Sequence, residues 1–77
     1  MAATVELKLY ATLRRPLPAD GKAVPVTPGT TVAGLLADLG IDLSTVKLVF
    51  IDGRKKSIDT ALYGGERVGV FPPVGGG

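Results

Sequence analysis

The sequence contains no cysteine and no histidine among its 77 residues. Without cysteine the chain can form neither a disulfide nor a thiolate nucleophile, and without histidine it lacks the commonest general base of enzymes. These two residue types are also the commonest ligands of zinc and related metals. Most classes of catalytic and metal-binding site are therefore excluded, and we expect no cofactor site.

Long apolar runs and a strong charge of either sign are also missing. Residues 1–10 alternate apolar with polar side chains, unlike a signal peptide, and no apolar run approaches membrane-spanning length. Nine Lys and Arg residues against seven Asp and Glu residues leave a net charge of only +2. The densest basic stretch, Arg54-Lys55-Lys56, has no interleaved aromatic residue on which a nucleic-acid base could stack. We expect a cytoplasmic protein that binds neither a membrane nor nucleic acid.

The chain does contain enough apolar residues for one small core. Hydrophobic residues make up 45% of the sequence and charged residues 21%, proportions typical of a folded, soluble domain. A length of 77 residues leaves room for a single domain. We assign residues 1–73 to that domain and residues 74–77 to a flexible tail that follows it.

Alternation of apolar and polar residues predicts the strands. The clearest pattern covers residues 4–13, in which the apolar set is Val5, Leu7, Leu9, Ala11 and Leu13. Further strands are predicted at residues 23–27, 47–51, 55–58 and 67–71. Because Pro25 has no backbone N–H, the strand at 23–27 should lie at an edge of the sheet.

One segment has the period of a helix instead. The apolar residues of TTVAGLLADLG are spaced i, i+3, i+4 and i+7, namely Val32, Leu35, Leu36 and Leu39. Thr30 or Thr31 is available as the N-cap, and Gly40 is placed to end the helix in a left-handed conformation, with Ile41 folding back on the last turn. We expect a helix of about three turns that packs on the core.

The predicted order β-β-α-β-β-β indicates an α+β domain, a mixed sheet of four to five strands packed against one main helix. If the first and last strands lie side by side in the middle, the arrangement is the β-grasp, or ubiquitin-like, fold. The C-terminus would then leave the sheet as a free tail.

That tail has an unusual composition, since residues 71–77 read FPPVGGG. Pro72 and Pro73 fix two φ angles near the polyproline value, which extends the base of the tail and lowers the entropy lost on capture. Gly76 and Gly77 carry no Cβ, so they could enter a narrow channel in another protein. A carboxylate at the tip needs activation, for example as an acyl-adenylate, before a sulfur nucleophile can attack it. The protein would therefore act as the substrate of a partner enzyme.

The ending, with the preceding Gly64-Gly65-Glu66 loop, resembles that of the MoaD and ThiS families of sulfur-carrier proteins. Those families typically finish in Phe-Pro-Pro-Val and a C-terminal Gly-Gly, as residues 71–77 nearly do here. The segment Tyr10-Ala11 followed by Arg14 is similar to the first strand of MoaD proteins, which places the chain closer to MoaD than to ThiS.

The resemblance implies a sulfur carrier rather than an enzyme. An E1-like adenylating enzyme of the MoeB or ThiF type would activate Gly77, and sulfur would convert it to a thiocarboxylate. The carrier would then donate that sulfur to a pterin precursor as the small subunit of molybdopterin synthase, in complex with a MoaE-like large subunit. When free, the carrier is expected to be a monomer.

Two alternatives use the same tail. One is a ThiS-type carrier that supplies sulfur for the thiazole of thiamine. The other is a ubiquitin-like modifier joined to lysines of target proteins through Gly76-Gly77. A free thiocarboxylate would favour the carriers, whereas isopeptide-linked conjugates would favour the modifier.

Strand parity predicts a partner-docking face on the side of the sheet away from the helix. If Val68 and Val70 face the helix, Phe71 faces the opposite way, and an exposed Tyr10 shares its side. Residues 48–51 are all apolar although only one alternate pair can face the core. We assign Leu48 and Phe50 to the outer face, where they would form an apolar surface. The predicted partner-binding residues are Tyr10, Arg14, Leu48, Phe50, Phe71, Pro72, Pro73, Val74 and Gly75.

Overall fold

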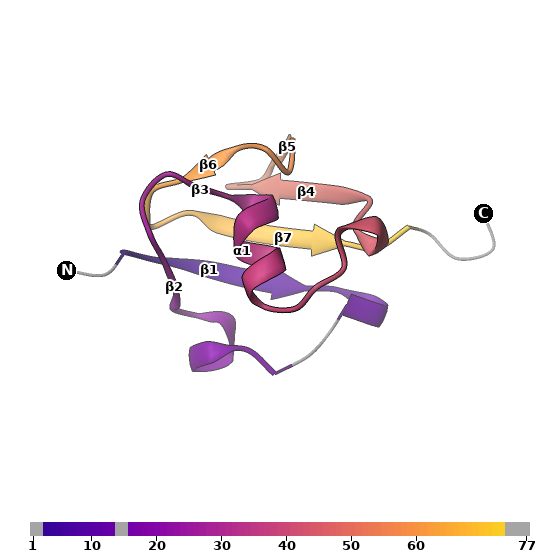
Figure 1. Ribbon diagram of the computed structural model, residues 1–77, viewed down its shortest axis with the longest axis horizontal. Helices are drawn as coiled ribbons and strands as arrows, with labels where there is room; N and C mark the ends of the chain where they lie inside the picture. The colour runs from indigo at the N-terminus through magenta and orange to yellow at the C-terminus, as the bar shows by residue number, and fades with distance from the viewer. Residues whose placement is uncertain (1–2, 14–15, 74–77) are drawn as a thin grey trace.

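The computed structural model describes residues 3–13 and 16–73, and Figure 1 presents them as a sheet with one helix lying across it. Five strands form the main sheet in the order β2-β1-β7-β4-β5. Their bounds are β1 Ala3–Leu9, β2 Val24–Val26, β4 Leu48–Ile51, β5 Arg54–Lys56 and β7 Arg67–Phe71. Two short strands, β3 (Thr30–Thr31) and β6 (Ala61–Leu62), pair with each other. The helix α1 spans Val32–Asp38, and the 3-10 helices are η1 Ala11–Leu13, η2 Pro18–Gly21 and η3 Leu43–Thr45.

The first and last strands form the centre of the sheet. β1 and β7 run parallel, with Leu7 opposite Val68 and Leu9 opposite Val70. The neighbouring pairs β1–β2, β4–β7 and β4–β5 are antiparallel. A mixed five-stranded sheet with one α-helix confirms the α+β prediction and the β-grasp arrangement. β2 lies at an edge, as its Pro25 predicted.

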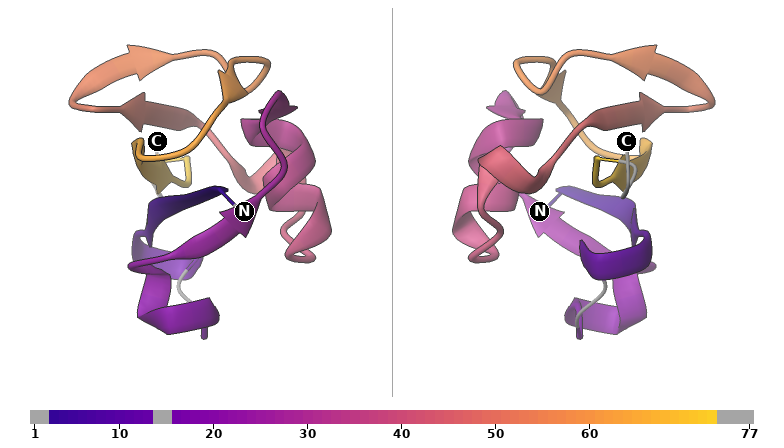
Figure 2. Two further views of the ribbon diagram at one scale, coloured as in Figure 1. Left: turned by 90° about the vertical axis from the view of Figure 1, so that its left-hand side faces the viewer. Right: turned by 90° about the vertical axis from the view of Figure 1, so that its right-hand side faces the viewer.

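One face of this sheet is covered by α1. Figure 2 views the sheet nearly edge-on and shows α1 on one side of it. Val32, Leu35 and Leu36 are the buried helix residues, and they join a single core cluster with buried residues of the strands. The strand members of that cluster are Val5, Leu7, Leu9, Val24, Val26, Val49, Ile51, Leu62, Val68 and Val70. The alternation that predicted the strands is thus the alternation between core and outer face.

The helix is shorter than expected. It has seven residues, about two turns rather than three. Thr31 is the N-cap and its hydroxyl accepts a hydrogen bond from the Gly34 N–H at 3.0 Å, while Thr30 and Thr31 are held in β3 by pairing with β6. At the other end Gly40 has a φ of +79° and the Ile41 N–H donates to the Leu36 carbonyl at 2.9 Å, as predicted. The strand before α1 and the glycine after it therefore set its length.

The first strand is also shorter than expected, because it ends at Leu9 instead of residue 13. Ala11 has a φ of +53° and is exposed, so its predicted place in the buried row is wrong. The chain turns there into η1, where the Leu13 N–H donates to the Tyr10 carbonyl at 3.1 Å. This turn brings Leu13 back into the core, and a continuing strand was therefore not needed to bury it.

Candidate protein-docking site

The outer face of the sheet consists of the alternate strand residues whose side chains point away from the helix. In β7, Val68 and Val70 are buried on the helix side, and Phe71 points to the other face. In β4, Val49 and Ile51 are buried in the same way. Leu48 and Phe50 are the partly buried, outward pair, so the geometry matches the predicted assignment.

Three rings meet on this face, and we call Tyr10, Phe50 and Phe71 the aromatic triad. The rings of Tyr10 and Phe71 stack with centroids 4.1 Å apart and planes inclined by 6°. Phe50 meets Phe71 edge to face, at 5.6 Å and 84°. Tyr10 and Phe71 therefore share one side of the sheet, as strand parity predicted, and their rings are in contact. Tyr10 was expected to be exposed, but its ring is only partly so, because the stacked rings of Tyr10 and Phe71 shield one another.

The strand register explains why these rings meet although they are far apart in sequence. Phe71 lies opposite Leu48 across the β4–β7 pair, and the Tyr10 N–H donates to the Val70 carbonyl at 3.1 Å. Tyr10 is thus held one step beyond the end of β1, beside the end of β7. Leu48 extends the apolar surface of the triad along β4.

A shallow depression of about 420 Å³ adjoins the triad. Besides the three rings, its lining includes Glu6, Lys8, Arg67 and Gly69. Lys8 Nζ lies 5.5 Å from the centre of the Tyr10 ring. Arg67 Nε lies 3.6 Å from Glu6 Oε2, and both side chains are well exposed, so this pair contributes little to stability.

Apart from the three rings, none of the lining residues was among the predicted partner-binding residues; they are Glu6, Lys8, Gly53, Arg67, Val68 and Gly69. The alternation along β1 places Glu6 and Lys8 on the same face as Tyr10, so these two residues could have been predicted for this surface from the sequence. The sequence pattern could not predict that Lys8 lies opposite Gly69, because this pairing depends on the parallel register of β1 and β7.

The base of the tail starts beside this surface. The Phe71 carbonyl accepts a hydrogen bond from the Lys47 N–H at 2.8 Å, so β7 is held up to its last residue. Pro72 is partly buried and Pro73 is exposed, and neither has an N–H to continue the sheet. Figure 1 shows β7 running in the same direction as β1 and ending at the edge of the molecule. The remaining predicted site residues, Arg14, Val74, Gly75, Gly76 and Gly77, lie outside the described residues.

The loop before β7 is held by the carboxylate of Glu66. Its oxygens accept hydrogen bonds from the N–H groups of Tyr63 at 2.8 Å and Gly64 at 2.7 Å. Partial desolvation opposes ionisation, but these donors outweigh it and hold the pKa of Glu66 below its ordinary value. Gly64 has a φ of +122°, and a Cβ there would lie 2.9 Å from that of Ala3, so the loop needs glycine at this position.

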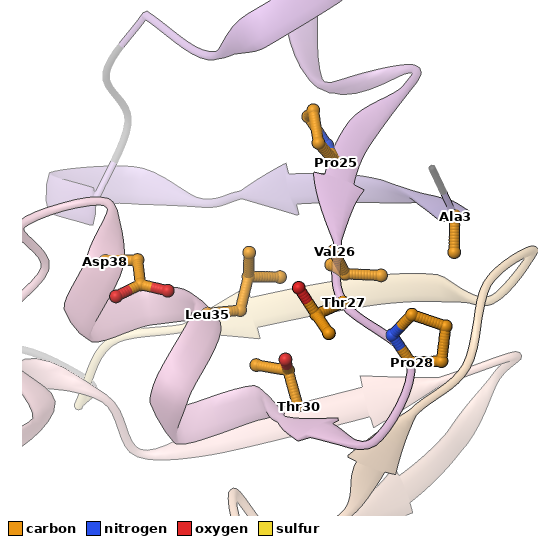
Figure 3. A pocket seen from close by; sticks show the side chains of 8 residues that line it. All are labelled: Ala3, Pro25, Val26, Thr27, Pro28, Thr30, Leu35 and Asp38. Atoms are coloured by element: carbon orange, nitrogen blue, oxygen red, sulfur yellow. The ribbon is translucent and has the colours of Figure 1, made fainter. Parts of the chain in front are cut away.

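A second hollow, of about 400 Å³, lies on another part of the surface, between β2, the segment that follows it and α1. Figure 3 shows Asp38 and Leu35 of the helix facing this hollow together with Thr27 and Thr30. The polar side chains that line this hollow are two hydroxyls and one carboxylate. Within residues 3–13 and 16–73, no group of three or more acidic side chains could hold a metal ion, and no helix is long and apolar enough to cross a membrane.

Three solved structures share the fold described above. The solution structure of the Haloferax volcanii HVO 2177 protein superposes with a TM-score of 0.70 at 28% identity, covering 99% of this chain and 88% of that one. A crystal structure of SAMP1 from Haloferax volcanii superposes with a TM-score of 0.67 at 26% identity, covering 97% of this chain and 100% of that one. A further crystal structure, of Haloferax volcanii small archaeal modifier protein 1, has a TM-score of 0.61 at 25% identity, covering 94% of this chain and 99% of that one. A search of curated proteins by sequence found no significant match.

These neighbours are small ubiquitin-like proteins, which agrees with the β-grasp topology. The profile of the ThiS family matches residues 7–77, from the first strand to the last glycine. The chain therefore belongs to the ThiS family.

Proposed function

We propose that this protein is a sulfur carrier for molybdopterin biosynthesis. Its Gly77 carboxylate would attack the α-phosphate of ATP on an E1-like enzyme of the MoeB or ThiF type, with pyrophosphate as the leaving group. A hydrosulfide ion would then displace AMP from the acyl-adenylate and leave a thiocarboxylate, which would donate its sulfur within a complex with a MoaE-like large subunit.

The observation that carries the proposal is the junction between the docking face and the tail. The triad residue Phe71 is the last residue of β7, and Pro72 and Pro73 follow it directly. A partner that docks on the triad would therefore meet the base of the tail, Pro72 and Pro73, beside its docking surface. The ThiS match, which continues to residue 77, supports assigning the chemistry to that end.

Two variants of the tail test the proposal. The protein is incubated with an E1-like enzyme, ATP and a sulfur source, and the mass of its last peptide is measured. We expect the gain of one oxygen-to-sulfur exchange in the native chain. Removal of Gly77 or the change Gly76→Val should abolish that gain, because the shortened or widened tip cannot be positioned for adenylation.

The matched control is the thermal melt of each variant. Residues 76 and 77 follow the domain assigned to residues 1–73, so the melting temperature should not change. Sulfur transfer at the native rate in Gly76→Val would refute the requirement for a tail without side chains.

The second candidate is a ubiquitin-like protein modifier. It is favoured by the two SAMP1 structures, whose name describes a small archaeal modifier protein. Such a modifier would use the same adenylation step, followed by attack of a lysine amine on the activated Gly77. A ThiS-type carrier for thiazole synthesis is the third candidate, and it would differ from the first only in its sulfur acceptor.

A further inference from the structure

One of the residues that line the depression beside the aromatic triad is a glycine, Gly69. Gly69 lies opposite Phe50 in β4 and beside Lys8 in β1, in the interior of the sheet. A Cβ on Gly69 would lie 3.6 Å from Tyr10 and 3.7 Å from Phe71, which are ordinary contact distances. Its φ is outside the positive range that favours glycine.

Neither the backbone nor the packing of the free protein therefore requires glycine at this position. A glycine in a strand interior weakens the strand, and it commonly marks a place where a ligand or another chain approaches closely. Here the missing side chain leaves open a depression that the rings of Phe50, Phe71 and Tyr10 border.

The rim of the depression is mainly cationic. Lys8 and Arg67 line it, with Glu6 as the one carboxylate. Arg67 is the partner of Glu6, and among the described residues no carboxylate oxygen lies within 4.0 Å of the Lys8 ammonium. Lys55, opposite Phe50 in β5, is exposed and adds a further cation at the edge of the same face.

We propose that this depression receives a single apolar side chain of the activating enzyme, flanked there by acidic residues that face Lys8 and Arg67. The apolar side chain fills the space over Gly69 against the aromatic triad, and the carboxylates balance the charge of the rim. This inference rests on the proposed function and adds to it the chemistry of the partner surface.

A second copy of the protein fits the surface less well. In a symmetric face-to-face pair, the same patch meets itself, so Lys8 and Arg67 of one copy would approach those of the other. The net charge of +2 also opposes self-association. An acidic partner surface removes both costs.

A graded series at Gly69 tests the proposal. The dissociation constants of the native chain, Gly69→Ala and Gly69→Val for the purified E1-like enzyme are measured by calorimetry, without ATP. The added side chains fill the depression, so affinity should fall progressively, by roughly tenfold or more for valine. The melting temperatures should stay the same or rise, because valine favours strands and the first added carbon meets no close contact.

Thr4→Val is the matched control. Thr4 is an exposed residue of β1 on the outer face, opposite Pro25 and outside the lining of the depression. The change also places a valine on this face, and it should leave the affinity unaltered. Lys8→Glu tests the rim: it should weaken binding and reduce the loss of affinity that added salt causes in the native chain.

The outcomes separate this inference from the proposed function. If the native chain binds the enzyme and Gly69→Val does not, the inference stands even when no adenylate forms, a result that would refute the proposed function alone. Equal affinity for the native and Gly69→Val chains overturns the inference while leaving adenylation of Gly77 intact. Absence of any binding by the native chain, or a native dimer that Gly69→Val dissociates, also overturns it.

Discussion

Replacing Phe71 by alanine compares what one ring of the outer face contributes to docking with what it contributes to folding. Phe71 makes both ring contacts of the aromatic triad, at 4.1 Å with Tyr10 and 5.6 Å with Phe50. Each aromatic pair contributes about 0.5–1.5 kcal/mol. Because the rings are partly exposed, we expect Phe71→Ala to lower the free energy of unfolding by about 1–2 kcal/mol.

The domain should remain folded after that loss. Typical stabilities of roughly 0.05–0.15 kcal/mol per residue give a chain of this length about 4–12 kcal/mol. At the centre of a partner interface, truncating the same ring should cost about 2 kcal/mol or more of binding free energy, an affinity loss of roughly thirtyfold. The loss of affinity, measured on folded protein, should therefore exceed the loss of stability.

Val70→Ala is the matched comparison on the same strand. Val70 is fully buried on the helix side, so its truncation should cost about 2 kcal/mol of stability and leave the affinity of the folded fraction unchanged. Urea unfolding gives the stability of both variants, and calorimetry with the E1-like enzyme gives their affinities. If Phe71→Ala binds as tightly as the native chain, the triad is not the docking surface and the reasoning from parity to function fails.

Two further predictions concern the supports of this surface. The lowered pKa of Glu66 means that its ionised form stabilises the fold at neutral pH, and that this contribution is lost as the pH falls below its ordinary value near 4.5. Glu66→Gln, which removes the charged acceptor of the Tyr63 and Gly64 N–H groups, should be less stable than the native chain at pH 7; a stability difference unchanged on acidification would contradict this. Thr31→Ala removes the hydroxyl that caps α1 through the Gly34 N–H and should lower the free energy of unfolding by about 1 kcal/mol. Urea unfolding with no change in midpoint would show that this cap contributes nothing.

Most strands of the main sheet could be predicted from the sequence, because the alternation of apolar and polar residues is a local signal. Alternation in residues 67–71 matches β7, and the proline at position 25 marks an edge strand. The outward side of Phe71 follows from the same alternation. Successive side chains of a strand point to opposite faces of the sheet. Once one residue of a strand is known to be buried, the faces of its neighbours in the same strand therefore follow.

Features that depend on contacts between distant segments could not be predicted. Alternation continues through Ala11 and Leu13, but Leu13 reaches the core from a turn that begins at Tyr10, so the pattern overestimated the strand. The length of α1 depended on the pairing of β3 with β6, two strands too short for a periodic signal. The depression over Gly69 required the register between β1, β7 and β4, which no single segment specifies.

The chemical state of the C-terminus in the native cell tests the central claim most directly. The protein is purified under non-reducing conditions, and the peptide that ends in Gly77 is identified by mass spectrometry, both in the free chain and in any higher-mass species. The carrier assignment predicts a fraction of free chain that ends in a thiocarboxylate, together with co-purification of a MoaE-like protein. A C-terminus found only as the carboxylate or as an isopeptide on lysines of other proteins would contradict it.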